Sequence, residues 1–251
     1  MIAALERVET AAWSQQYAGL PPEHRGLAVA LGPLTVFGVG AWPGSAWHAT
    51  VTGLHERPLP AQLDAALALL DRLGARSPVL PVVDEAVPRD WLTERGFTVA
   101  TPLLRVSAPA GGAPPEGEVR TAVVGPEAGA AVATVCLQGF GGGVDQAWWR
   151  AGLGRPGWTQ VVAYGGGTPV GTAALFVEGD EAWIGSATTV PQARRRGVHR
   201  ALLAARLAEA AAQGATRVSA KTVPGSVGAR ALERAGFTPA HRLVQWRRPA
   251  A

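Results

Sequence analysis

The sequence of 251 residues contains one cysteine, one lysine and no asparagine. The single cysteine, Cys136, excludes an intramolecular disulfide framework and a multi-cysteine metal site, and no metal is expected. Residues 1–7 lack a basic region followed by an apolar segment, so no signal peptide is expected. Residues 26–54 carry no formally charged side chain, but glycines and prolines divide them into pieces of strand length. We therefore expect a cytoplasmic protein without a membrane span.

The net charge of +4 is distributed unevenly along the chain. Residues 1–110 contain 8 Arg and 10 acidic residues, which gives −2, whereas residues 111–251 contain 14 Arg, 1 Lys and 9 acidic residues, which gives +6. The basic half favours an anionic ligand. Nucleic acid is a rival interpretation, but the sequence has no long basic run and no recognisable nucleic-acid motif. No nucleic-acid partner is expected.

The most informative segment is residues 188–203, which follow an apolar stretch typical of a strand. Leucines and alanines recur at helical spacing after it, and between the two lie Arg194, Arg195 and Arg196, then Gly197. A helix N-terminus presents unpaired backbone N–H groups, and a glycine allows an anion to approach the backbone. This pattern predicts a phosphate or pyrophosphate site, although a solvated basic turn is the simpler alternative.

Alternating strand and helix patterns predict an α/β fold, and the two halves align at an offset of 140 residues. Gly96-Phe97-Thr98 falls on Gly236-Phe237-Thr238, each following a short predicted helix with a leucine four residues before the glycine. We expect two similar domains, each a mixed, mostly antiparallel sheet flanked by helices. The first would cover residues 1–106, a linker residues 107–117, and the second residues 118–251.

The first copy differs at the segment that matches the arginine loop. Residues 54–60 contain no glycine, and Pro58 and Pro60 remove backbone N–H donors. We therefore expect only the second copy to bind the anion.

Three features together resemble the GNAT acetyltransferase superfamily. Residues 194–199 fit the first and fourth positions of its acyl-CoA motif, although His199 replaces the usual small residue at the last. Val190-Pro191 precedes the motif and Arg234-Ala235-Gly236-Phe237 follows it, as is typical of the family. The chain is similar to tandem GNAT proteins in which one half, here the N-terminal one, is degenerate. The resemblance implies acetyl-CoA as cofactor.

The resemblance also implies which residues hold that cofactor. Backbone N–H groups of residues 195–200 would hold the pyrophosphate, and the strand end at residues 188–190 would align the pantetheine arm, with a backbone N–H near Val190 for the thioester oxygen. Ser226 is most simply a helix N-cap, with contact to the pantetheine arm as the alternative. The implied cofactor-binding residues are Thr188, Thr189, Val190, Arg194, Arg195, Arg196, Gly197, Val198, His199, Arg200 and Ser226.

No catalytic acid or base can be assigned. The position where the family often has a tyrosine is Leu232, and residues 187–189 offer no glutamate. Glu178, Asp180 and Glu181 lie at the far hairpin of that strand, so a water relay or positioning alone are the options. The resemblance implies that the acceptor side lies in the segment that contains Phe140, Asp145, Trp148 and Trp149, with Trp158 nearby. The alternative is that the aromatic residues belong to the core and Asp145 to the surface.

The expected activity is transfer of an acetyl group from acetyl-CoA to an amine of a small molecule or peptide by direct attack. A non-catalytic acyl-CoA-binding or sensor module is the first alternative, and a nucleic-acid-associated basic protein the second. The pair of domains would act as a monomeric pseudo-dimer or as a homodimer. The sequence does not identify the acceptor.

Overall fold

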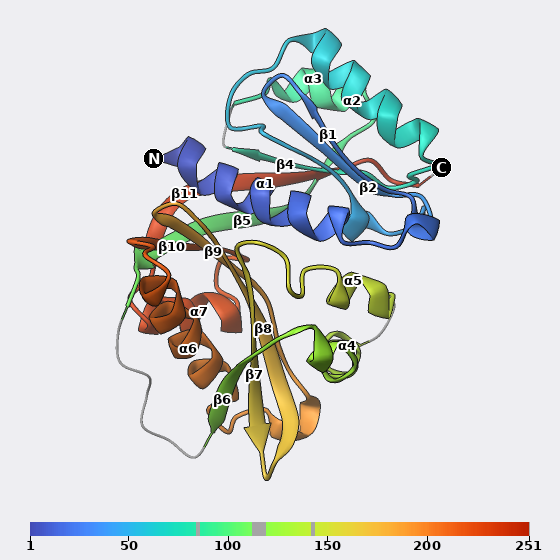
Figure 1. The fold of residues 1–251 in the computed structure, drawn as a ribbon. Coiled ribbons are helices and arrows are strands. Elements are labelled where there is room, and N and C mark those ends of the chain that lie inside the picture. The colour runs from blue at the N-terminus through green and yellow to red at the C-terminus, as the bar shows by residue number, and fades with distance from the viewer. Residues whose placement is uncertain (84–85, 112–118, 142–143, 251) are drawn as a thin grey trace. The chain divides into compact units, whose positions relative to one another are not determined.

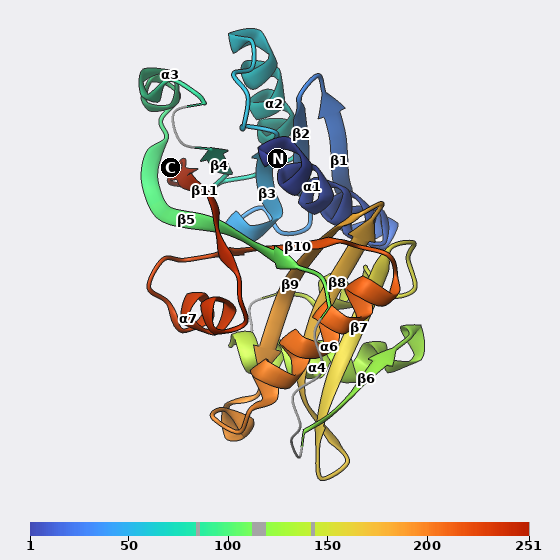
Figure 2. The same cartoon turned by 90° about the vertical axis from the view of Figure 1, so that its left-hand side faces the viewer.

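The computed structural model describes residues 1–83, 86–111, 119–141 and 144–250 (Figures 1 and 2). The chain forms two compact units, and neither is continuous in sequence. The first unit comprises Met1–Val106, Lys221–Ala229 and Pro239–Ala251, and the second comprises Ser107–Ala220 and Arg230–Thr238. Each unit contains a mixed, mostly antiparallel sheet with helices packed on it, so the predicted fold class is confirmed.

In the first unit, β1 pairs with β2 and β2 with β3 in antiparallel hairpins, whereas β3 and β4 are parallel. The parallel pair requires a crossover, which α2 provides. The helices α1 and α3 and the strand β5 are the other elements of this part of the chain. The bounds are α1 Ile2–Ala18, β1 Gly26–Leu31, β2 Leu34–Val39, β3 Ala49–Thr52, α2 Pro60–Arg72, β4 Val79–Val83, α3 Arg89–Glu94 and β5 Thr98–Pro109.

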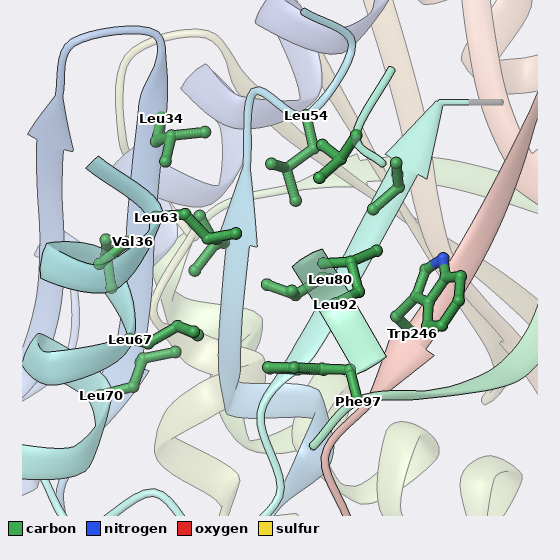
Figure 3. Close-up of a cluster of buried hydrophobic side chains, with 14 of the residues drawn as sticks. Leu34, Val36, Leu54, Leu63, Leu67, Leu70, Leu80, Leu92, Phe97 and Trp246 are labelled. Carbon is green, nitrogen blue, oxygen red and sulfur yellow. The ribbon is translucent and has the colours of Figure 1, made fainter. Parts of the chain in front are cut away.

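The core of the first unit combines the apolar stripe of α2 with the strands beneath it (Figure 3). Leu63 and Leu70 of that stripe are fully buried, as their helical spacing predicts. Leu80 of β4 and Phe97 also contribute (Figure 3). Trp246 lies in the same cluster, although it comes from the last strand of the chain.

That last strand, β11 (Thr238–Arg247), pairs antiparallel with β4 from Leu243↔Val83 to Arg247↔Val79. A contiguous second domain of residues 118–251 therefore differs from the observed division into units. The physical reason is that β11 buries Trp246 in the first core and completes hydrogen bonds along β4. A local sequence pattern predicts a strand but does not say which strand it pairs with.

The sheet of the second unit also joins antiparallel strands to a parallel pair, with four antiparallel strands among the described residues in place of three. β6, β7, β8 and β9 pair antiparallel in order, and β9 and β10 are parallel. Figure 1 shows α6 and α4 on opposite sides of β7–β9, and both helices pack on β8 and β9. The bounds are β6 Arg120–Val124, α4 Gly129–Phe140, α5 Gln146–Arg150, β7 Trp158–Gly165, β8 Thr168–Glu178, β9 Glu181–Thr189, α6 Val198–Ala212, β10 Arg217–Thr222 and α7 Val227–Arg234.

The predicted linker of residues 107–117 is only partly described. Residues 107–109 continue strand β5, which corrects the expected start of the linker, and residues 112–117 lie outside the described residues. Within the described ranges, no helix is long and apolar enough to cross a membrane.

Candidate functional site

Strands β9 and β10 of the second unit pair only at their beginning. Their parallel register runs from Arg217↔Glu181 to Ser219↔Trp183, after which β9 continues to Thr189 (Figure 2). The edge of β9 that faces β10 therefore becomes open over its last residues. An open strand edge presents unpaired backbone donors and acceptors, which can bind an extended ligand.

A bulge in β9 lies beside this opening. Ala174 opposes Gly185, but Thr172 opposes Thr188, so β9 has one extra residue between these two pairs. Ser186 has the left-handed backbone conformation with φ 48°. One extra residue shifts the phase of the strand and increases its bend.

The bulge determines which backbone groups reach the open edge. The Val190 N–H donates to the Val170 carbonyl at 3.0 Å, toward β8. Because successive N–H groups of a strand point to opposite sides, that of Thr189 points to the open edge. Val190's own N–H is therefore already paired, and Thr189 supplies the backbone N–H near Val190 that is directed to the open edge.

The turn after β9 leads into an uncapped helix. A short 3-10 turn at Pro191–Ala193 is followed by left-handed conformations at Arg195 (φ 64°) and Gly197 (φ 79°). The N-cap of α6 is Gly197, and no side chain of the described residues caps the helix. The backbone N–H groups of residues 198–200 donate to no other residue in the described part of the chain. Three unpaired donors at the positive end of a 15-residue helix fit an anionic ligand.

The arginine side chains of this turn have different surroundings. Arg195, Arg196 and Arg200 are exposed. Arg194 donates from Nε to the Thr189 carbonyl at 3.3 Å and from Nη2 to the Gly139 carbonyl at 3.1 Å. The side chain of Arg194 thus joins the end of β9 to the end of α4, and its contact with the anion stays a prediction.

Val198 and His199 form the start of α6. Val198 is buried in the apolar cluster between α6 and the sheet. The pKa of His199 is lowered, first because the ring is buried and then because of the nearby Arg206 charge. A neutral ring is consistent with the interpretation that the backbone N–H of His199 matters more than its side chain.

Two glycines that the sequence patterns did not single out allow close packing around β9. A Cβ at Gly139 would overlap Thr188 Oγ1 and lie 2.9 Å from Thr188 Cβ. A Cβ at Gly171, which pairs with Thr189, would overlap the Val198 side chain. Neither glycine has a positive φ. Only the close approach of α4 and α6 requires them, which no local pattern reveals.

The predicted acceptor residues separate into two groups. Phe140, which is 48% exposed, stacks on Trp149 with ring centroids 5.1 Å apart. The Trp149 Nε1 is buried and has no partner among the described residues. Asp145 instead caps α5, since its Oδ1 accepts from the Ala147 N–H at 2.7 Å. Trp148 is half-buried on α5.

Other singled-out residues have structural explanations. Trp158 packs edge-on against Phe176 and Trp183. Ser226, in a segment of the first unit, accepts from the Ala229 N–H at 3.0 Å and so caps α7. Cys136 is buried, and burial raises its pKa to about 12, as expected for an inert core thiol.

The carboxylates of the β8–β9 hairpin are remote from the open edge. Glu181 begins β9 and accepts from Arg217 Nε at 3.0 Å. Thr189 ends the same strand, so about 26 Å of extended backbone separates the two residues. Leu232 is buried. Within the described residues of the second unit, no acid or base lies on the last residues of β9.

Two fully buried arginines were not anticipated. Arg206 of α6 lies one turn after Leu202 and two turns after Val198, on the side of the helix that faces the sheet. Arg105 of β5 pairs with Glu6 and Glu9 of α1. The sequence could have indicated Arg206, because this arginine stands at a core position of an apolar helical stripe. No local pattern indicates that Arg105 pairs with Glu6 and Glu9.

Comparison with known proteins agrees with this geometry. Residues 142–237 match the model of the Acetyltransferase (GNAT) family. The fold is that of the GNAT acetyltransferases. A GCN5-related N-acetyltransferase from Kribbella flavida is 22% identical with a TM-score of 0.69, covering 96% of this chain and 95% of that chain. One from Sphaerobacter thermophilus is 16% identical with a TM-score of 0.62, covering 99% and 93%.

A tandem GNAT protein from the clavulanic acid biosynthesis pathway is 14% identical, with a TM-score of 0.54 and coverage of 87% of this chain and 84% of that chain. No curated protein matches the sequence. The open edge of β9, its bulge and the uncapped start of α6 all fall within the residues that match the GNAT family.

Proposed function

We propose that this chain is a tandem GNAT protein that transfers an acetyl group from acetyl-CoA to an amine of a small molecule or peptide. The observation that carries the proposal is the uncapped start of α6 directly after the open end of β9. The match of residues 142–237 to the Acetyltransferase (GNAT) family model also supports it.

The residues present fit an extended, acidic ligand. The N–H groups of residues 198–200 and the exposed Arg195 and Arg196 would hold its pyrophosphate. The open edge of β9 at Thr189 would align its pantetheine arm by backbone hydrogen bonds. Acetyl-CoA bound there would supply an activated thioester. A neutral amine would attack its carbonyl carbon, the C–S bond would break, and CoA would leave as its thiol after taking up the proton that the amine loses.

The chain's own contribution is then positioning and charge stabilisation. The Thr189 N–H, directed to the open edge, is the donor best placed to stabilise a developing negative charge. No carboxylate or tyrosine of the second unit's described residues is available at this strand end, so we assign no general base. Water would remove the proton from the amine.

The first unit would have lost the same capacity. Its corresponding turn leads into α2 with Pro60 at the first helical position, where an N–H is missing. The Gln62 side chain accepts from the Leu59 N–H at 2.9 Å, so a residue of the helix itself satisfies this backbone donor. The first unit would serve the fold instead.

A non-catalytic acyl-CoA sensor is the second candidate. The specific observation in its favour is that Leu232 occupies the position of the usual catalytic tyrosine and is buried. A sensor would bind acetyl-CoA and CoA but would release no thiol with any amine.

Calorimetry with acetyl-CoA and with CoA tests the proposal on wild type and Arg196→Glu. We expect micromolar binding to wild type and a loss of about tenfold or more in the variant, because one charge-assisted contact becomes repulsive. Thiol release with a panel of amines then separates enzyme from sensor. No binding by wild type would overturn both, and salt-dependent binding of DNA or RNA would favour the nucleic-acid alternative.

A further inference from the structure

Arg206 is a buried cation that has no counter-ion in the part of the chain that the structure describes. The residue is 2% exposed, and no Asp or Glu among the described residues pairs with it. Burial lowers its pKa to about 9. A buried charge without a partner opposes stability, whereas a methionine or leucine would fit an apolar stripe at no such cost. Its presence therefore calls for a role that an apolar side chain cannot perform.

The guanidinium contacts the bulge of β9. Its Nη1 donates to the Ala174 carbonyl at 3.3 Å and to the Gly185 carbonyl at 3.4 Å, while Nε donates to Leu202 on its own helix at 3.1 Å. Ala174 and Gly185 are the last regular pair before the extra residue of β9. Arg206 thus satisfies carbonyls from both strands where the regular ladder is interrupted.

The extra residue decides the phase of the open strand end. Without it, Thr189 would oppose Val170, and its N–H would take the carbonyl that Val190 uses now. The open edge would then receive the Val190 N–H instead, directly before Pro191, and the side chains of Thr188 and Thr189 would exchange faces.

We infer that Arg206 is a positioning residue of the acyl-CoA site, which holds the bulge so that the Thr189 N–H faces the open edge of β9. It acts from inside the sheet and touches neither the substrate nor the reacting atoms. The inference rests on the proposed function for the identity of the ligand. It does not rest on it for the state of the strand, which can be measured on the protein alone.

Amide hydrogen exchange by NMR on the full chain is the first test, comparing wild type with Arg206→Met. The methionine keeps similar length but has no donor. In wild type the Val190 amide should be protected and that of Thr189 should exchange rapidly. In R206M we expect protection of Val190 to fall at least tenfold. Arg206→Lys, which retains charge and a donor, should fold and keep most of the protection.

Acetyl-CoA affinity is the second measurement. R206M should bind acetyl-CoA at least tenfold more weakly while its thermal unfolding temperature stays equal or rises, because a buried charge has been removed. The control is Leu207→Ala, the next residue on α6, which is buried but contacts no bulge carbonyl. It should lower the unfolding temperature and leave affinity unchanged, a pattern opposite to that of R206M.

Unchanged exchange at Val190 in R206M would overturn the inference even if wild type binds acetyl-CoA. Equal losses of affinity in R206M and L207A would also overturn it, because general destabilisation would then explain both. If protection of Val190 falls in R206M as predicted but wild type does not bind acetyl-CoA, the proposed function is overturned, and with it the ligand assigned to the site.

Discussion

Each unit contains one fully buried arginine, and the two differ in their partners. Arg105 donates from Nε to Glu6 Oε1 at 2.9 Å and pairs with Glu9, joining β5 to α1. Burial alone would lower the pKa of Arg105, but the two carboxylates raise it above its usual value. Among the described residues, Arg206 has only backbone carbonyls as acceptors, and burial lowers its pKa to about 9. The first arginine stabilises packing, whereas the second shapes a strand.

The two units also differ at the helix that connects the two strands of each parallel pair. The first crossing, from β3 to α2, closes its helix start with Pro60 and Gln62. The second, from β9 to α6, leaves the helix start without a cap. Similar succession of elements therefore gives one turn that satisfies its own backbone and one that leaves donors for a ligand.

The largest effect should come from Arg105→Met. The change removes the guanidinium from the buried Glu6 and Glu9, which also pair with His241 and Lys221, and should cost about 3–5 kcal/mol of unfolding free energy. Urea denaturation followed by tryptophan fluorescence measures it. Arg206→Met should change the same quantity little, so equal losses in the two variants would break the comparison.

Gly197→Asp should reduce acetyl-CoA affinity by about 100-fold, or about 3 kcal/mol, because it places a carboxylate at the helix start and strains a left-handed position. The matched control is Gly214→Asp. Gly214 has φ 88° and open space for a Cβ, as Gly197 does, but follows the other end of α6. Calorimetry should find wild-type affinity in that control; similar losses in both would mean that the helix start is not the ligand site.

Acid should destabilise the first unit through Glu6. Burial tends to raise the pKa of Glu6, but the Arg105 charge, a hydrogen bond with His241 and the Lys221 charge lower it from 4.5 to about 2. A depressed folded-state pKa contributes stability above pH 4.5 that is lost as the pH falls toward 2, of the order of 3 kcal/mol. Unfolding free energies measured across this range should fall steeply in wild type and more gently in Glu6→Gln.

Gly139→Ala should have a smaller effect on stability and on acetyl-CoA affinity, through the contact between α4 and the end of β9. The added methyl group overlaps Thr188 and should cost about 1–3 kcal/mol of stability, together with a severalfold loss of acetyl-CoA affinity. Adding Thr188→Ala removes the overlapping hydroxyl and should restore part of both. A double variant no better than Gly139→Ala alone would argue against this contact.

The sequence by itself determined most secondary structure, because apolar periodicity and glycine or proline positions act locally. The strand that ends at Thr189 and the helix that begins at Val198 lie where the local pattern predicts them. The arginine turn and the helix start after Gly197 were also found from local residues. Its resemblance to a known family then led to the proposed ligand.

The tertiary structure alone decided which distant residues meet. Trp246 enters the first core because β11 pairs with β4, and strand pairing depends on edges far away in the sequence. Thr189 rather than Val190 presents its N–H because of one extra residue in β9, and Arg206 holds that bulge across the sheet. Register and close approach are properties of two segments together, so neither segment's own sequence contains them.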